Sequence, residues 1–201
     1  MPEPAGSTDA DLIGASLEEP RLFETVFERH YDAIRRYLHR RVGRETGDDL
    51  AAETFAQAFT TRRRYDVSRH DARPWLYGIA SNLLRHELRS ERAQFAAYAR
   101  QAGTLEAIVE PRFEEHADIA RIVPHVANAL RGLQPRDRDV LLLIGWADLT
   151  YAEVAVALGI PEGTVGSRFN RARRQVREAL EPLAAIQGWR VSWMETSEGE
   201  S

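Results

Sequence analysis

Cysteine and lysine are both absent from this chain of 201 residues. Without cysteine there is no disulfide framework, no thiol nucleophile and no thiolate ligand for a metal ion. All 27 basic side chains are therefore arginines, a bias that we attribute to genomic base composition rather than to function.

Long apolar runs are missing as well. The longest, Val140–Ile144, is far shorter than the ~20 apolar residues that a membrane-spanning helix needs. The N-terminal stretch MPEPAGSTDADLIGAS is acidic and rich in small residues, and it lacks the basic start and apolar centre of a secretory signal. These absences predict a cytoplasmic protein without membrane insertion.

Charge is distributed unevenly along the chain. The net charge of −4 at pH 7 argues weakly against a nonspecific nucleic-acid coat protein, so the placement of the charges matters more. The arginines gather at residues 35–44, 62–73, 85–92 and 168–177. The sequence shows no internal repeat, glycine-rich phosphate loop, metal-spaced histidine cluster or Ser/His/Asp pattern, and we therefore expect no cofactor and no metal.

The stretch LTYAEVAVALGIPEGTVGSRFNRARRQVREAL, residues 149–180, contains two helical patterns around a short break. The first opens at Thr150 with a capping-box spacing. It ends at Gly159, a residue type that tolerates the positive φ of a helix C-terminus. The IPEG segment cannot continue this helix, and Thr164 is placed to cap the next one.

The second pattern has an apolar stripe and an arginine-rich face. The stripe consists of Val165, Phe169, Ala172, Val176 and Leu180, at helical spacing. The opposite face carries Ser167, Arg168, Arg171, Arg174 and Arg177. A short helix, a tight turn and an arginine-faced helix favour a helix-turn-helix whose second helix enters the DNA major groove. The alternative is an ordinary helical hairpin with a solvated basic face, because basic amphipathic helices are common.

The pattern LxxLTYAEVAxxLGIPEGTVxSRxxRARRxxREAL resembles the −35-reading domain of the sigma-70 family, in its extracytoplasmic-function (ECF) branch. The resemblance implies that the second helix contacts DNA through Thr164, Ser167, Arg168, Arg171 and Arg174. One position departs from the family pattern, since Gly166 stands where arginine or lysine is common. Glycine removes one DNA contact and costs up to ~1 kcal/mol of helix propensity, which makes the −35 sequence harder to infer.

The N-terminal half carries three more helical patterns after a lead, residues 1–20, that we expect to be flexible. An amphipathic helix runs from Leu22 to Gly43, and a second one starts at residues 47–49. On the second helix, the spacing places Asp49, Glu53 and Gln57 on one face. The pattern by itself indicates no more than a solvent-exposed helix face.

A polar loop follows at residues 62–71, and Pro74 suits the first turn of a third helix. We assign Trp75, Ile79 and Leu83, with the neighbouring Leu76, Leu84 and Leu88, to the apolar side of this helix. Tyr77 is assigned to its polar side.

Two segments here also resemble the sigma-70 family. DARPWLYGIASNLLRHELRSERA resembles the −10-reading helix of sigma domain 2, and DDLAAETFAQAF resembles the helix through which the family binds the polymerase β′ subunit. The resemblance implies a core-polymerase face formed by Asp48, Asp49, Glu53 and Gln57. It implies −10 contacts by Tyr65, Ser68, His70, Tyr77, Asn82, Arg85 and Arg89.

Chemistry suggests different tasks for these −10 candidates. The amide of Asn82 can both donate and accept, so it can read a base edge. Arg85 and Arg89 are suited to phosphates, which position the protein without specifying sequence. The loop at residues 64–71 lies where the family captures an unstacked base, a task that needs polar groups and a stacking surface.

The remaining segments complete a two-domain organisation. We predict a first domain at residues 21–92, a linker at 93–117 with a helical piece near 94–100, a second domain at 118–181 and a tail at 182–201. Within the second domain, helices over 119–133 and from Pro135 onward would support the helix-turn-helix.

Taken together, the motifs predict an all-α sigma factor with two small helical domains. The resemblance implies that it is not an enzyme and leaves catalysis to the polymerase. Its partners would be core RNA polymerase, through the β′ and β subunits, promoter DNA and an anti-sigma factor. Two alternatives stay open from the residues alone. One is a stand-alone helix-turn-helix regulator, and the other is a metal-dependent helical hydrolase that uses Asp49 and Glu53.

Overall fold

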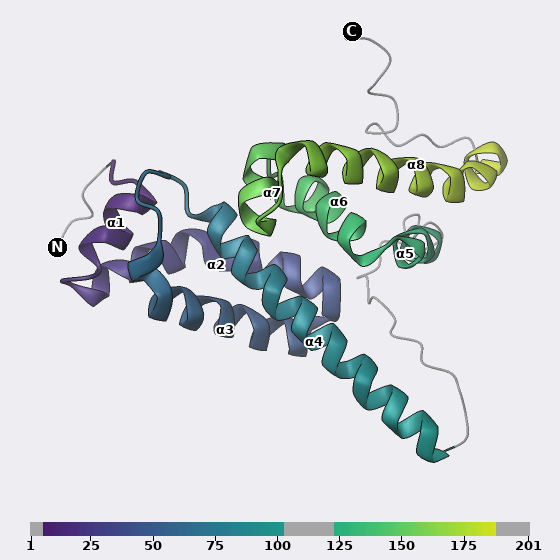
Figure 1. Cartoon of the computed structure of the whole chain (residues 1–201), viewed down its shortest axis with the longest axis horizontal. Coiled ribbons are helices and arrows are strands. Elements are labelled where there is room, and N and C mark those ends of the chain that lie inside the picture. The colour runs from purple at the N-terminus through teal and green to yellow at the C-terminus, as the bar shows by residue number, and fades with distance from the viewer. Residues whose placement is uncertain (1–5, 103–122, 188–201) are drawn as a thin grey trace, which may run out of the picture. The chain divides into compact units, whose positions relative to one another are not determined.

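The computed structural model describes residues 6–102 and 123–187, and every regular element in these residues is helical (Figure 1). The elements are α1 (Asp9–Ala15), η1 (Pro20–Leu22), α2 (Phe23–Val42), α3 (Arg44–Thr61), η2 (Arg62–Arg64), α4 (Arg73–Ala102), α5 (Val123–Gly132), α6 (Pro135–Ala147), α7 (Tyr151–Leu158) and α8 (Glu162–Gln187). The predicted all-α class is confirmed. None of these helices combines the length and the apolar character needed to span a membrane, within the parts of the chain just given.

The helices group into two compact units. The first contains α1 to α4, and residues 152–159 cluster with it; the second contains α5, α6 and α8.

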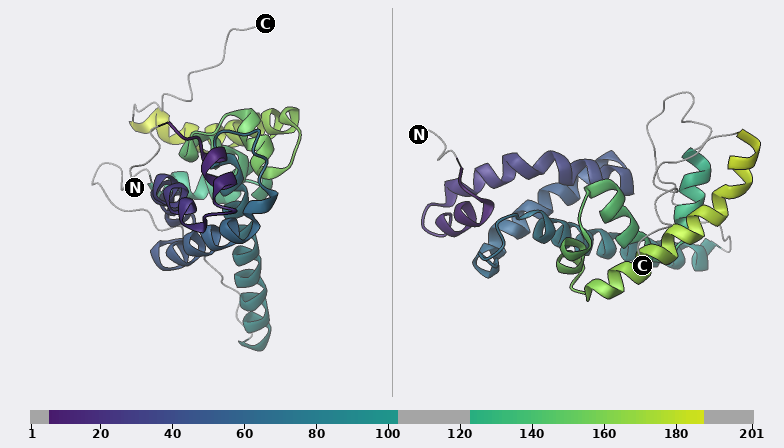
Figure 2. Two further views of the ribbon diagram at one scale, coloured as in Figure 1. Left: turned by 90° about the vertical axis from the view of Figure 1, so that its left-hand side faces the viewer. Right: turned by 90° about the horizontal axis from the view of Figure 1, so that it is seen from above.

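In the first unit, α2 and α3 lie side by side, and α4 packs against both (Figure 1, Figure 2). The joint between α2 and α3 is Gly43, whose φ of 85° and ψ of 177° suit a residue without a side chain. Gly47 lets the two helices approach closely, because a Cβ there would lie 2.7 Å from Cδ2 and 3.0 Å from the backbone nitrogen of His39. The sequence prediction placed the start of α3 at residues 47–49, whereas the helix begins at Arg44.

The core of the first unit is formed by one stripe from each long helix. The fully buried members include Val26, Ile34 and Leu38 of α2, Ala51 and Ala58 of α3, and Leu76, Ala80 and Leu84 of α4. On α4 the predicted Leu76, Ile79 and Leu84 are buried, whereas the predicted Trp75, Leu83 and Leu88 are only half-buried. Tyr77 and Ala80 are buried as well, because α4 packs against two helices at once and buries a wider face than one stripe.

Two predicted boundaries of the first unit were wrong. The N-terminal lead is not wholly flexible, because Asp9–Ala15 form a helix capped by Thr8, and Leu12 and Ile13 are buried. At the other end, α4 continues to Ala102, so residues 93–102 belong to a helix and not to a linker. The expected helical piece near 94–100 is part of this helix, while residues 103–117 lie outside the described residues.

In the second unit, α6 and α5 both pack against α8. Buried residues include Val140 and Leu143 of α6 and the predicted α8 stripe of Val165, Ala172, Val176 and Leu180. Phe169, the remaining member of that stripe, is half-buried with its ring centroid 5.6 Å from that of Tyr151. The stripe prediction is therefore confirmed, with one member at its edge.

Helix α8 begins and ends beyond its predicted limits. It starts at Glu162, where Thr164 and Val165 donate their amide hydrogens to the Pro161 carbonyl at 2.9 and 3.2 Å. Thr164 is thus in the first turn and is not the N-cap that the sequence suggested. The helix also passes Pro182 and reaches Gln187, so the tail prediction at residues 182–201 was wrong for its first part.

Candidate polymerase and DNA interfaces

Helix α3 presents a polar face to solvent. Asp49, Glu53 and Gln57 are all exposed and recur every four residues, so they share this face. Asp48 differs, because its Oδ1 accepts hydrogen bonds from Arg35 Nε at 2.5 Å and pairs with His39 Nε2 at 2.7 Å. The bonds from Arg35 and then His39 lower the pKa of Asp48 to about 2. Asp48 therefore ties α3 to α2, whereas the other three side chains are open to a partner.

The loop between η2 and α4 is folded on itself. Tyr65 is buried, with its ring centroid 5.0 Å from that of Trp75 and its hydroxyl donating to the Arg69 carbonyl. Burial raises the pKa of Tyr65 to about 12. Oδ1 of Asp66 accepts from the amide and the hydroxyl of Ser68 at 3.1 and 2.7 Å, which closes a tight turn. Of the three loop candidates, Ser68 and His70 are exposed and Tyr65 is not.

The N-terminal helix meets this loop through Asp9, which sequence reasoning missed. The Asp9 amide donates to the His70 carbonyl at 3.1 Å, and Asp9 Oδ2 accepts from the Ala72 amide at 2.9 Å. Asp9 also pairs with His30 Nε2 at 2.6 Å and Arg29 Nη1 at 3.2 Å. Burial alone would raise the pKa of Asp9, but the hydrogen bonds from His30, Ala72 and Arg29 together lower it. The spacing of Thr8 and Asp11, a capping box, was the signal that could have revealed α1.

A metal site on α3 finds no support in this geometry. Among residues 6–102 and 123–187, the grouping of His, Asp and Glu that could share a metal ion is Asp9, His30 and Asp71, and it excludes Asp49 and Glu53. The oxygens of Asp9 already accept hydrogen bonds from protein donors. A structural role explains this cluster.

On α4 the predicted −10 candidates separate into buried and exposed groups. Tyr77 is 3% exposed, and its ring lies edge-on to Tyr37 with centroids 5.3 Å apart. Its assignment to the polar side was wrong, because the buried face of α4 is wider than predicted and includes this ring. Asn82 is exposed and its Oδ1 accepts from Arg85 Nη2 at 2.6 Å. Arg89 is also exposed and donates through Nε to the Arg85 carbonyl at 3.1 Å.

The helix-turn-helix segment follows the predicted order of α7, a turn at Gly159 and α8. Gly159 has the predicted positive φ, at 63°. On α8, Ser167, Arg171 and Arg174 are exposed, and Thr164 and Arg168 are half-buried. The Oγ of Ser167 donates to the Thr164 carbonyl at 3.1 Å, and Arg174 Nε lies 3.9 Å from Glu178.

A polar cleft opens between the first turns of α6 and α8. It has a volume of about 520 Å³ and is lined by Gln134, Pro135, Arg136, Asp137, Thr164, Ser167, Arg168 and Arg171. Nη1 of Arg171 donates to Oδ2 of Asp137 at 3.3 Å, and the Asp137 side chain is only 3% exposed. Four of the five predicted −35 residues therefore meet at one cleft, and Arg174 lies outside it.

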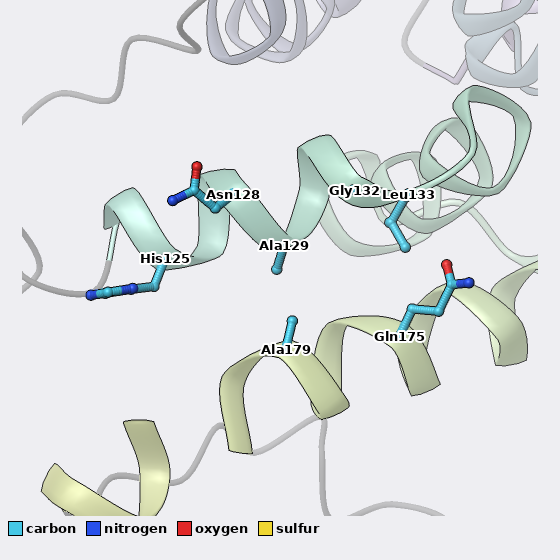
Figure 3. Close-up of a pocket in the computed structure, with 7 residues that line it drawn as sticks. All are labelled: His125, Asn128, Ala129, Gly132, Leu133, Gln175 and Ala179. Atoms are coloured by element: carbon cyan, nitrogen blue, oxygen red, sulfur yellow. The ribbon is translucent and has the colours of Figure 1, made fainter. Parts of the chain in front are cut away.

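A second groove lies between α5 and α8 (Figure 3). It has a volume of about 310 Å³, with His125 and Asn128 on α5 and Gln175 on α8. Ala129 and Ala179 face one another across it, and these small side chains leave the groove open.

The regular elements of the described residues are helical, and the order of α7, turn and α8 along the chain is that of a helix-turn-helix segment. Residues 26–94 match the family described as Sigma-70 region 2, and residues 126–176 match Sigma-70 region 4. A stand-alone helix-turn-helix regulator would not account for the first of these matches.

Known proteins resemble the chain over most of its length. SigL, an ECF RNA polymerase sigma factor of Mycobacterium tuberculosis, is 30% identical over 176 residues, which are 87% of this chain and 97% of the relative. SigE of Mycolicibacterium smegmatis is 29% identical over 180 residues, 89% of this chain and 68% of the relative. The chain belongs to the ECF sigma factors of the sigma-70 family. It therefore binds core RNA polymerase and promoter DNA and directs promoter-specific transcription initiation.

Solved structures share the fold. CnrH, in complex with the cytosolic domain of CnrY, superposes with a TM-score of 0.63 at 24% identity, over 87% of this chain and 97% of CnrH. RpoE of Bartonella quintana, in complex with the anti-sigma factor NepR, gives a TM-score of 0.58 at 22% identity, over 80% and 98% of the two chains.

Proposed function

We propose that the two sigma regions divide promoter recognition between them. Residues 21–92 bind core polymerase and the −10 element, and residues 118–181 bind the −35 element. The proposal rests on the order of the two region matches along one chain, each with exposed polar groups of suitable chemistry. The factor works in the cytoplasm and is not itself an enzyme, since bond formation is left to the polymerase.

The core-binding surface is the exposed face of α3. Asp49, Glu53 and Gln57 are held by a helix whose other side is buried against α2 and α4, so the face is rigid before it meets its partner. Asp48 supports the face indirectly through its bonds to Arg35 and His39. The occupant is the β′ subunit of core polymerase.

Charge reversal on this face tests the assignment. The variant Asp49→Arg with Glu53→Arg should weaken binding to core polymerase, because the partner meets repulsion instead of attraction. Glu24→Arg with Glu28→Arg is the matched control, since both glutamates are exposed and also lie four residues apart on one helix. Equal core affinity of the two double variants, with circular dichroism confirming folding, would remove α3 as the binding face.

The −10 element is read by Asn82 and by the exposed part of the loop before α4. Asn82 supplies an amide for a base edge, while Arg85 and Arg89 supply positive charge for the phosphates of the same strand. Ser68 and His70 are the loop groups available to an unstacked base, and Tyr65 holds the loop in shape. Unstacking would be offset by the new contacts on the protein.

Melting assays test the −10 assignment. Asn82→Ala should reduce open-complex formation on duplex promoter, and a template already melted at −10 should recover part of the loss because its bases are already unstacked. Permanganate footprinting measures the melting directly. Normal melting by the Asn82 variant would contradict the role of this residue.

The −35 element is read from the cleft at the start of α8. Arg168 should make a base contact, so Arg168→Ala should cost about 1–3 kcal/mol and relax the preference at one position. Arg174 lies outside the cleft and is assigned to a phosphate. Arg174→Ala should therefore weaken binding to all promoter sequences alike, and the slope of log binding constant against log salt concentration should become shallower by about one. Promoter titrations at several salt concentrations measure both effects, and wild-type behaviour in both variants would refute the assignment.

Regulation by an anti-sigma factor is part of the proposal. It is motivated by the fold shared with CnrH and RpoE, whose structures contain CnrY and NepR respectively. Co-purification from the native cell, followed by run-off transcription with and without the captured protein, tests it. A captured protein that binds the chain but does not lower transcription would be no anti-sigma factor.

A further inference from the structure

Helix α1 holds both ends of the loop that precedes α4. At the entry, the Ser16 carbonyl accepts from Arg62 Nε and Nη2 at 3.4 and 3.5 Å. At the exit, Asp9 bonds to the His70 carbonyl and the Ala72 amide at 3.1 and 2.9 Å. The two anchor points are the C-cap and the first residue of one short helix, so α1 sets the span between the two ends of the loop.

The exit anchor is the stronger of the two. Asp9 is 6% exposed, and its carboxylate accepts hydrogen bonds from three residues in two segments: Arg29 and His30 of α2, and Ala72 of the loop. Hydrogen bonds to a charged group in such a setting are stronger than neutral ones. The backbone on both sides of Asp71 is therefore fixed relative to α2.

Between these anchors, the loop exposes the groups that could meet a base. Val67 is 59% exposed, which is high for an apolar side chain, and Ser68 and His70 are exposed beside it. Tyr65 packs on Trp75 and holds the first half of the loop in place. An apolar side chain and two polar ones on a backbone fixed at both ends suit the capture of a flat base with polar edges.

We propose that Asp9 is a positioning residue for −10 recognition, through which α1 fixes the loop at residues 65–72 in the shape that captures an unstacked base. This rests on the proposed −10 role of the loop. Asp9 does not touch DNA; it acts through the backbone of His70 and Ala72. The N-terminal helix is thereby a specificity element of the promoter-binding unit.

The test compares Asp9→Ala with Asp11→Ala. Both variants remove one carboxylate from α1, but Asp11 accepts hydrogen bonds from Thr8 and makes none with the loop backbone. Asp9→Asn is the conservative variant, because its amide oxygen can still accept from the Ala72 amide. Each variant is assembled with core polymerase and assayed on a library randomised at −10 and, separately, at −35.

Asp9→Ala should lower the discrimination between −10 bases by about tenfold, the effect of losing a hydrogen bond to a charged group. Asp9→Asn should retain part of it, and Asp11→Ala should stay near wild type. Core affinity and −35 preference should not change in any of the three. Amide hydrogen exchange at Ala72 should be about tenfold faster in Asp9→Ala, which shows the loosened anchor without reference to DNA.

Three results would overturn the proposal. In the first, Asp9→Ala keeps the −10 base preference, while replacement of the loop by that of a related sigma factor changes the preference. The loop would then read the base without the help of Asp9. If neither change affects the preference, the loop assignment itself fails. If Asp11→Ala matches Asp9→Ala, or if core affinity and −35 preference fall equally, the effect is one of helix or domain stability.

Discussion

Tyr77 provides a sharp test of the structure, because sequence reasoning and the fold assign it opposite tasks. Its side chain is 3% exposed and its ring packs edge-on against Tyr37. Tyr77→Ala removes an aromatic ring from the core of the first unit, and such truncations cost ~3–5 kcal/mol. About 0.5–1.5 kcal/mol of this comes from the aromatic pair itself. Tyr77→Phe keeps the ring and should cost only the hydrogen bonding of the hydroxyl, up to ~1 kcal/mol.

Urea titration of the full chain, followed by circular dichroism and by hydrogen exchange in α2, α3 and α4, measures these changes separately from the second unit. Exchange protection should fall across all three helices in Tyr77→Ala and should persist in α8. The reasoning would be refuted if Tyr77→Ala left this protection intact and instead reduced binding to −10 DNA. That outcome would place Tyr77 at the DNA, where the sequence put it.

Three further outcomes follow from the geometry. Gly43→Ala should destabilise the first unit by ~1–3 kcal/mol in urea titration, because a residue with a side chain is strained at a φ of 85°. The control Gly145→Ala in α6 should be neutral or stabilising, since nothing lies within 4 Å of its new methyl group. Asp48 has its pKa lowered to about 2, so its stabilising effect is fully present above pH 3.8 and is lost as the pH falls toward 2; acid unfolding should begin at higher pH in Asp48→Asn. Tyr65 has its pKa raised to about 12, so its contribution is complete below pH 10 and is lost as the pH rises toward 12; Tyr65→Phe should resist alkaline unfolding better, as followed by circular dichroism.

The spacing of apolar residues and the positions of helix-ending glycines predicted much of the fold, because both depend on interactions between residues close together in the chain. Gly43 and Gly159 were placed correctly at helix ends, since only a residue without a side chain adopts their backbone angles easily. The α8 stripe was predicted because one buried side of a helix imposes its period on the sequence. Local rules of this kind act within a few residues and need no knowledge of the partner.

The predictions were wrong where contacts between distant parts of the chain determine which residues are buried and which segments are helical. Helix α4 packs against two helices, and therefore the buried set is wider than the predicted apolar side and includes Tyr77. Helix α1 is short and acidic, and contacts with α2 and the loop keep it in place rather than intrinsic propensity. Asp9 was not visible as a site residue for the same reason, because its partners lie 20 or more positions away in the chain.

An ion pair within the protein changes how a mutation of Arg171, at the proposed DNA interface, should be interpreted. Its Nη1 donates to Asp137, whose side chain is 3% exposed, so Arg171→Ala removes the proposed DNA contact and also leaves a buried carboxylate without this partner. The carboxylate that is no longer paired also repels the phosphates of DNA, so the loss of promoter affinity overstates the contribution of the Arg171 contact. We expect Arg171→Ala to reduce −35 binding less in the Asp137→Asn background than in the wild type. Affinity titrations of the two single variants and the double variant give the coupling between the residues. Strictly additive losses would show that Arg171 contacts DNA independently of Asp137.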